Sequence, residues 1–91
     1  MKTINFDFNT IRKSTDFYSQ FRNKFEINSD FVNNRDGLWD ALTGMIELPV
    51  KIEFHNLNLT SLDKFQKLIS LFEDAEEETD GLLEFSYFID K

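Results

Sequence analysis

Three short stretches of the chain alternate apolar and polar side chains, the pattern of a β-strand with one buried face. They are residues 4–8, 50–54 and 83–89. Pro49 precedes the second stretch, and a proline is tolerated where a strand begins. Helical patterns separate the three strands, as the long crossovers between parallel strands require. The sequence therefore predicts a small α/β fold, with a three-stranded parallel sheet packed against three to four helices.

Two helices are predicted between the first two strands. In the first, phenylalanines recur every four residues at Phe17, Phe21 and Phe25, and Ser14 is placed to cap its start. A loop follows over residues 26–33, and its last residue, Asn33, is predicted to cap the second helix.

The second helix is predicted to end at Gly44 or in the turn just after it. With Asn33 as its cap, Asp36 would be its third residue, where a carboxylate can accept hydrogen bonds from free backbone amides. Gly37 lies inside this helix, where glycine costs about 1 kcal/mol relative to alanine. The sequence shows no local benefit that offsets this cost.

The two sides of the second helix differ in chemistry. At about 100° per residue, its apolar side carries Leu38, Ala41, Leu42 and Met45. Asp36 and Asp40 lie one turn apart on the opposite side, where like charges repel each other. Trp39 and Thr43 fall on or near this acidic side. The pattern favours a recognition surface for a cationic partner; the alternatives are a capping and a solvated aspartate, a tryptophan at the core edge, and Met45 packed in the core.

The connection to the third strand contains the longest predicted helix. Residues 55–59 are predicted to form a short turn or helical fragment, and the helix starts at Thr60 or Ser61. Its apolar stripe comprises Leu62, Phe65, Leu68, Ile69, Phe72 and Ala75. Asp80 and Gly81 are predicted to close it with a glycine C-cap.

Six acidic residues crowd the end of this helix, within residues 73–80. A helix C-terminus carries partial negative charge, so each acid there costs about 0.3–1 kcal/mol near the surface. Lysine or arginine would be more stable. Two interpretations stay open, an external function for the acids or simple tolerance on an exposed face.

Charge is unevenly divided along the chain, whose net charge is −7. Residues 1–25 have five basic and two acidic residues, a balance of +3, whereas residues 26–91 have five basic and fifteen acidic ones, a balance of −10. This charge disfavours nucleic acid as a ligand and would attract a basic partner. Solubility alone is the alternative explanation.

Length and composition narrow the class of protein. Ninety-one residues suffice for one domain, predicted over residues 1–91, and eleven phenylalanines supply a bulky core. With no cysteine, neither a disulfide framework nor a thiolate metal site is expected. No apolar run resembles a signal peptide or approaches the roughly 20 residues of a membrane span. We expect a cytoplasmic protein.

The sequence offers little material for catalysis. It has three glycines, none in a phosphate-binding loop, and its one histidine, His55, has no partner at ligand spacing. The usual combinations of acid, base and nucleophile are scarce. We therefore expect no enzyme activity, no catalytic residue, no cofactor and no metal.

The chain resembles the barstar family of ribonuclease inhibitors. The closest match is Leu38-Trp-Asp-Ala-Leu-Thr-Gly44, followed by Glu47-Leu-Pro49 leading into a strand. Asn34 and Asp36 stand where the family has an asparagine and an aspartate, and Phe72-Glu-Asp-Ala75 is a weaker match. The order of elements matches along nearly the whole chain, although the sequence match is specific only over about residues 33–49.

The resemblance implies an inhibitor, or immunity protein, that occupies the active site of a small basic ribonuclease such as barnase. The acidic charge argues against a nucleic-acid partner and the lack of a long apolar run argues against a membrane partner, and we expect a monomer when the protein is free. Asp40 resembles the family's central phosphate mimic, and Asp36 its neighbour that engages a second cationic or amide group. Asp74 and Glu78 match positions of family glutamates, with Asp74 expected to reach the rim of the enzyme. The partner-binding set implied is Phe31, Asn34, Asp36, Trp39, Asp40, Thr43, Gly44, Met45, Asp74 and Glu78.

Three departures from the family pattern concern the cognate enzyme. Asp30 stands where an aromatic residue is usual, Met45 replaces a tryptophan, and Arg35 replaces an apolar residue. Because aromatic anchors carry much of the energy of an interface, these changes argue against inhibition of barnase itself and leave open a different cognate nuclease. An acidic interaction module of the same fold, binding another basic protein, is the alternative function.

Overall fold

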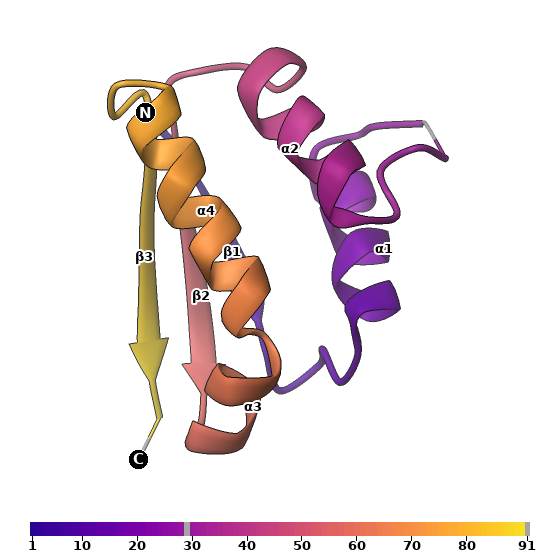
Figure 1. The fold of residues 1–91 in the computed structure, drawn as a ribbon, viewed down its shortest axis with the longest axis vertical. Helices are drawn as coiled ribbons and strands as arrows, with labels where there is room; N and C mark the ends of the chain where they lie inside the picture. Colours follow the sequence, from indigo (N-terminus) through magenta and orange to yellow (C-terminus); the bar gives the residue numbers. More distant parts are fainter. Residues whose placement is uncertain (29, 91) are drawn as a thin grey trace.

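The structure, a computed structural model, describes residues 1–28 and 30–90 and contains a three-stranded parallel sheet with four helices (Figure 1). The elements are β1 (Lys2–Asp7), α1 (Ser14–Lys24), α2 (Arg35–Gly44), β2 (Val50–Leu57), α3 (Leu59–Lys64), α4 (Gln66–Glu78) and β3 (Leu83–Ile89). The strand order is β1-β2-β3, and both pairings are parallel. The predicted α/β fold is confirmed.

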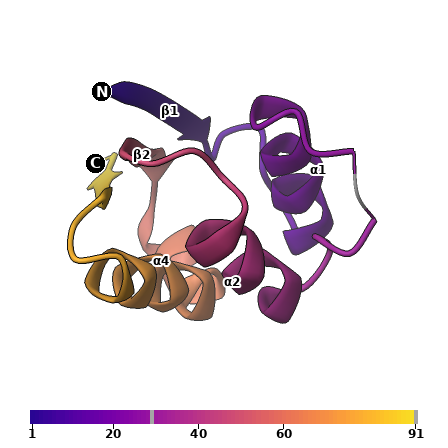
Figure 2. The same ribbon diagram turned by 90° about the horizontal axis from the view of Figure 1, so that it is seen from above.

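The register aligns the apolar positions of the three strands. Ile52 of β2 pairs with Ile4 of β1 and Phe85 of β3, and the next apolar row aligns Phe6 with Phe54. Because side chains two residues apart share a face, these rows form one apolar surface of the sheet. Helices α2 and α4 lie side by side and pack against each other (Figure 2).

The core is built largely from aromatic rings. Phe6 and Phe17 lie with ring centroids 4.7 Å apart, and Phe54 and Phe72 meet edge to face at 5.0 Å. Such tilted pairs add to the stabilisation from burial alone. Phe17 and Phe21 are fully buried as predicted, whereas Phe25 follows the end of α1 and is only partly buried.

Helix α1 starts with an N-cap at Lys13, so the predicted cap at Ser14 is wrong by one residue. The carboxylate of Asp16 accepts hydrogen bonds from the backbone amides of Arg12 and Lys13, at 3.0 and 3.2 Å. These bonds lower the pKa of Asp16 below its ordinary value, with smaller contributions from the charges of Lys13 and Arg12. The acidic third residue thus secures the start of the helix.

The second connection differs from the prediction. Strand β2 runs on through His55 to Leu57, where a turn was expected, and the long helix is divided into α3 and α4. The side chain of Asn58 caps α3 by accepting from the amide of Ser61 at 2.8 Å. Phe65 breaks the helix, and its buried ring contacts Phe8 at 5.2 Å between centroids. The periodicity concealed the break because the apolar stripe continues through it.

Helix α4 closes as predicted at Asp80 and Gly81. The amide of Gly81 donates to the carbonyl of Glu76 at 2.9 Å, and that of Asp80 donates to Glu77 at 3.1 Å. Both residues have a positive φ, 53° and 82°, the left-handed conformation that suits glycine. This pair of bonds is a Schellman motif.

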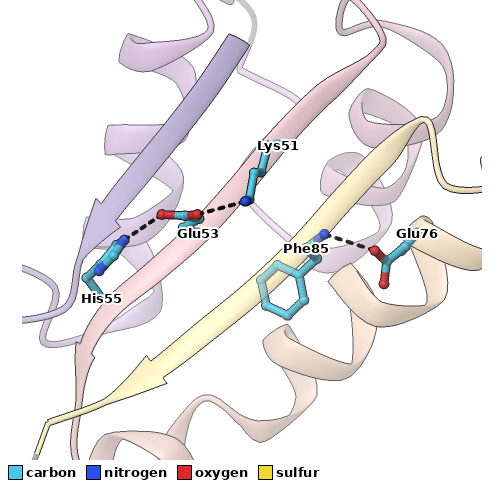
Figure 3. Close-up of polar contacts among 5 residues, drawn as sticks. All are labelled: Lys51, Glu53, His55, Glu76 and Phe85. Atoms are coloured by element: carbon cyan, nitrogen blue, oxygen red, sulfur yellow. Dashed lines mark hydrogen bonds and ion pairs between the residues drawn. The ribbon is translucent and has the colours of Figure 1, made fainter. Parts of the chain in front are cut away.

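Side chains from the end of α4 bind the outer edge of β3. The hydroxyl of Thr79 accepts from the amide of Leu83 at 3.1 Å, and the carboxylate of Glu76 accepts from the amide of Phe85 at 3.2 Å (Figure 3). Because β3 is an edge strand, these amides have no neighbouring strand to pair with.

Within residues 1–28 and 30–90, no helix combines the length and the apolar character that crossing a bilayer demands.

Candidate protein-binding surface on α2 and α4

Helix α2 is anchored at its start by Asn34. The side chain of Asn34 accepts a hydrogen bond from the amide of Gly37 at 2.8 Å, which is the geometry of an N-cap. The predicted cap at Asn33 is therefore wrong by one residue. As a consequence Asp36 is the second residue of the helix and not the third.

Gly37 permits a close contact that the sequence does not reveal. A Cβ atom built at this position would lie 1.9 Å from the carbonyl oxygen of Phe31. Glycine is thus required for the loop to pass against the first turn of α2, and the expectation that it brings no local benefit is wrong. The guanidinium of Arg22 in α1 holds the same loop by donating to the carbonyl of Val32 at 2.6 Å.

The apolar side of α2 is buried as predicted at Leu38, Ala41 and Leu42, none of which is exposed to solvent. On the opposite side, both Asp36 and Asp40 are exposed. Neither carboxylate forms a hydrogen bond or ion pair with any residue that the structure describes. We call these two side chains the α2 acidic pair. Their negative charges are held by a fixed helix. Neither has a bonded partner among the described residues, although the start of the helix favours the charge of Asp36.

The residues predicted to surround the acidic pair differ in how far they are exposed. Trp39 is partly buried against the core, and its carbonyl accepts a hydrogen bond from the Thr43 hydroxyl at 2.8 Å. Gly44 is exposed, with nothing within 4 Å of the place where a Cβ would lie. Phe31 is 45% exposed.

Met45 was placed on the apolar side of the helix, with core packing as the alternative to partner contact, and the structure does not bury it. Its side chain is 47% exposed, because α2 ends at Gly44 and Met45 forms the C-cap outside the helical stripe. Met45 lines a cavity with Phe25 and Ile46 at the end of α2, and its exposure makes it available to a partner.

Asp74 and Glu78, the two residues predicted on α4, are both exposed, but only Asp74 lies beside the groove that α4 shares with α2. Asp74 lines a groove of about 340 Å³ together with Arg35 of α2, so the structure brings it to the α2 side. Glu78 lies one helical turn further along and does not line this groove. The groove also contains Gln66, Lys67, Ser70 and Leu71.

A protein-family model for barstar, described as a barnase inhibitor, matches residues 1–90. The chain belongs to the barstar family. The three-stranded parallel sheet with four helices is consistent with the barstar fold. Barstar proteins are inhibitors of barnase-like ribonucleases and not enzymes, and the family suggests the same general function for this chain.

His55, the single histidine of this barstar-family chain, contacts neighbouring side chains on the sheet. His55 Nε2 lies 2.9 Å from a carboxylate oxygen of Glu53, and Lys51 binds the other oxygen at 3.4 Å (Figure 3). The imidazole also stacks on Phe88, with centroids 4.9 Å apart. The hydrogen bond to His55, aided by Lys51, lowers the pKa of Glu53. Among the described residues no group of three or more potential ligands is arranged to hold a metal.

Sequence reasoning missed the groove between α2 and α4. Arg35 was noticed only as a departure from the family pattern, and Lys67 was not noticed at all. The one available signal was that both cations lie near helix starts, where positive charge is unfavourable.

Proposed function

We propose that this protein is a cytoplasmic inhibitor of a small basic ribonuclease, and that it places Asp40 where the enzyme binds an RNA phosphate. The observation that supports this proposal is the α2 acidic pair, two exposed carboxylates with no bonded partner among residues 1–28 and 30–90. They lie on a helix whose other side is buried at Leu38, Ala41 and Leu42.

The chemistry of the target explains why carboxylates suit this task. A ribonuclease binds the phosphodiester with arginine, lysine and histidine side chains, which also form strong charge-assisted hydrogen bonds to carboxylates. The partner of Asp40 would be such a cation, and Asp36 would engage a second cationic or amide group. Because burial fixes α2 before binding, little conformational entropy is lost when the complex forms.

The surrounding residues have proposed supporting roles. Trp39, Thr43 and Gly44 would frame the contact, while Phe31 and Met45 would add apolar area around it. Asn34 holds the start of the helix, and Asp74 would reach the rim of the enzyme. Glu78, further along α4, would act mainly through its charge.

The cognate enzyme is proposed to differ from barnase. Met45 and Asp30 replace the aromatic residues of the family pattern, and Arg35 places a positive charge next to Asp36. A basic enzyme would be repelled by Arg35 unless its own surface lacks positive charge where it meets this residue. The cognate enzyme is therefore proposed to differ from the family's usual target at the surface that faces Arg35.

The test begins with capture of a basic protein by the immobilised chain, from lysate and medium of the source cells. The proposal expects the captured protein to be a ribonuclease that is inhibited at a one-to-one ratio, with inhibition relieved by excess RNA or a mononucleotide. A captured partner without nuclease activity would instead support the acidic interaction module. Inhibition that RNA cannot relieve would contradict phosphate mimicry.

A further inference from the structure

Two cations occupy unfavourable positions at the start of helices. Arg35 is the first residue of α2 and Lys67 is the second residue of α4. The first turn of a helix carries partial positive charge, so both side chains are locally destabilising there. Neither forms an ion pair or hydrogen bond within the part of the chain that the structure describes. Among the described residues, no hydrogen bond or ion pair compensates for these charges.

Both cations face the groove between α2 and α4. Arg35 contributes from one wall and Lys67 from the other, and the groove holds about 340 Å³. An adjoining cavity of about 390 Å³ is also lined by Arg35 and Lys67, together with Lys64 and one acid, Asp63. Lys64 is already engaged, since its ammonium donates to the carbonyl of Arg12. The structure thus gathers positive charge at one point of a strongly acidic surface.

The groove lies within the surface that the proposed function requires the enzyme to cover. The α2 acidic pair follows directly after Arg35, and Asp74 itself lines the groove. An enzyme that contacts both helices therefore covers the two cations as well. Covering a cation without supplying a partner is costly, because the charge loses its water. Asp74 in the groove and Asp63 in the adjoining cavity offset part of this cost, but neither acid forms an ion pair with Arg35 or Lys67.

We infer that the cognate ribonuclease inserts a carboxylate into this groove, between Arg35 and Lys67, and that this contact selects the enzyme. The inference rests on the proposed function. A guanidinium can bind a carboxylate through two parallel hydrogen bonds, and an ammonium adds a point charge from the other wall. A nuclease with a neutral or basic side chain at this point would leave the two cations unpaired and would be rejected.

Charge reversal tests the inference because two hypotheses predict opposite results. One is long-range electrostatic attraction alone, and the other is a carboxylate of the enzyme bound in the groove. The variants are Arg35→Glu and Lys67→Glu, and the partner is the ribonuclease captured above. If only long-range attraction to a basic enzyme mattered, extra negative charge would speed association and tighten binding. If the groove receives a carboxylate, each variant dissociates faster and the dissociation constant rises about tenfold or more.

Lys51→Glu is the matched control. It makes the same change in net charge on β2, at a residue that alternates with the buried Ile52 and Phe54 and so lies on the face of the sheet away from the helices (Figure 3). This control is expected to show faster association and an unchanged dissociation rate. If the two groove variants behave like Lys51→Glu, the inference is wrong.

A second pair of variants guards against misfolding. Arg35→Met and Lys67→Met keep most of the side-chain length, remove the charge and relieve the unfavourable position at the helix start. We expect both to be folded and still to dissociate faster than the wild type. Restoration of binding when a nuclease acid is changed to lysine and paired with Arg35→Glu would identify the inserted carboxylate.

Asp40→Ala, measured in the same assay, separates the two proposals. Weaker binding by Asp40→Ala with no effect of the groove variants overturns only the groove inference. Weaker binding by the groove variants with no effect of Asp40→Ala supports the groove and contradicts phosphate mimicry.

Discussion

Helices α2 and α4 both carry acids at four-residue spacing, but the structure uses these acids differently. On α2, Asp36 and Asp40 are exposed and form no hydrogen bond or ion pair with the described residues. On α4, Glu76 is partly buried, and its carboxylate binds the amide of Phe85 at the edge of β3. Helix α2 leaves both carboxylates available to a partner, whereas α4 uses one carboxylate to bind a backbone amide at the edge of the sheet.

This difference shows that a run of acids need not have a single purpose. The sequence left open an external function or simple tolerance for residues 73–80. Glu76 fits neither interpretation, because its bond to β3 is internal and specific. The role of a carboxylate depends on which amide or cation the fold brings near it, and spacing along one helix cannot show this.

The largest expected effect concerns Asp40. Asp40→Ala should raise the inhibition constant by about two orders of magnitude or more, because a charged group would be lost opposite a desolvated cation. Glu77→Ala is the control, since it removes an equal charge from an exposed site on α4. Enzyme titration measures both. Equal losses for the two variants would mean that net charge, and not position, governs inhibition.

The next effect concerns the placement of α2. Gly37→Ala should lower the free energy of unfolding by about 1–3 kcal/mol, because the added methyl group collides with the Phe31 carbonyl. Gly44→Ala is the matched control, because nothing lies near its Cβ position. Chemical denaturation of both variants measures the difference. A more stable Gly37→Ala protein would show that helix propensity outweighs the close contact.

A smaller effect should follow from opening the β3 edge. Glu76→Leu should cost about 1 kcal/mol of stability and promote self-association through β3, since the Phe85 amide loses its acceptor. Glu76→Gln keeps an oxygen that can accept this bond and should associate less. Sedimentation at rising protein concentration, with denaturation, measures both properties. Glu76→Leu remaining unassociated and fully stable would remove the structural role of Glu76.

The smallest expected effect separates Asp74 from Glu78. Asp74→Ala should weaken inhibition by less than about 1 kcal/mol and Glu78→Ala by less still, because rim charges contribute little. Both should slow association, and added salt should reduce the difference from wild type. Stopped-flow rates at two salt concentrations measure this. A larger loss for Glu78→Ala would place the enzyme further along α4 than we propose.

Periodicity predicted the fold well because each strand and helix buries one face. The alternation at Ile4, Phe6 and Phe8 and the spacing of Phe17 and Phe21 follow from that burial. Boundaries were less predictable. The caps at Ser14 and Asn33 were each misplaced by one residue. Asn33 and Asn34 have the same capping chemistry, whereas Lys13 takes the cap position of α1 by its backbone alone, because Asp16 accepts from the free amides there.

Features that depend on contact between distant segments could not be predicted. The break at Phe65 and the groove between Arg35 and Lys67 arise from tertiary packing. The outward position of Asp36 and Asp40 was predictable, because it follows from the burial of Leu38 and Leu42 on the same helix. The identity of the groove's occupant depends on the partner's surface.

The bond from Arg22 to the Val32 carbonyl affects any attempt to transplant the recognition helix. A graft of residues 34–45 alone would leave behind the side chain that fixes the incoming loop. It would also leave behind the Phe31 carbonyl against which Gly37 is fitted. A minimal peptide mimic therefore needs a substitute for α1, or a covalent brace that restores the angle at which the two aspartates are presented.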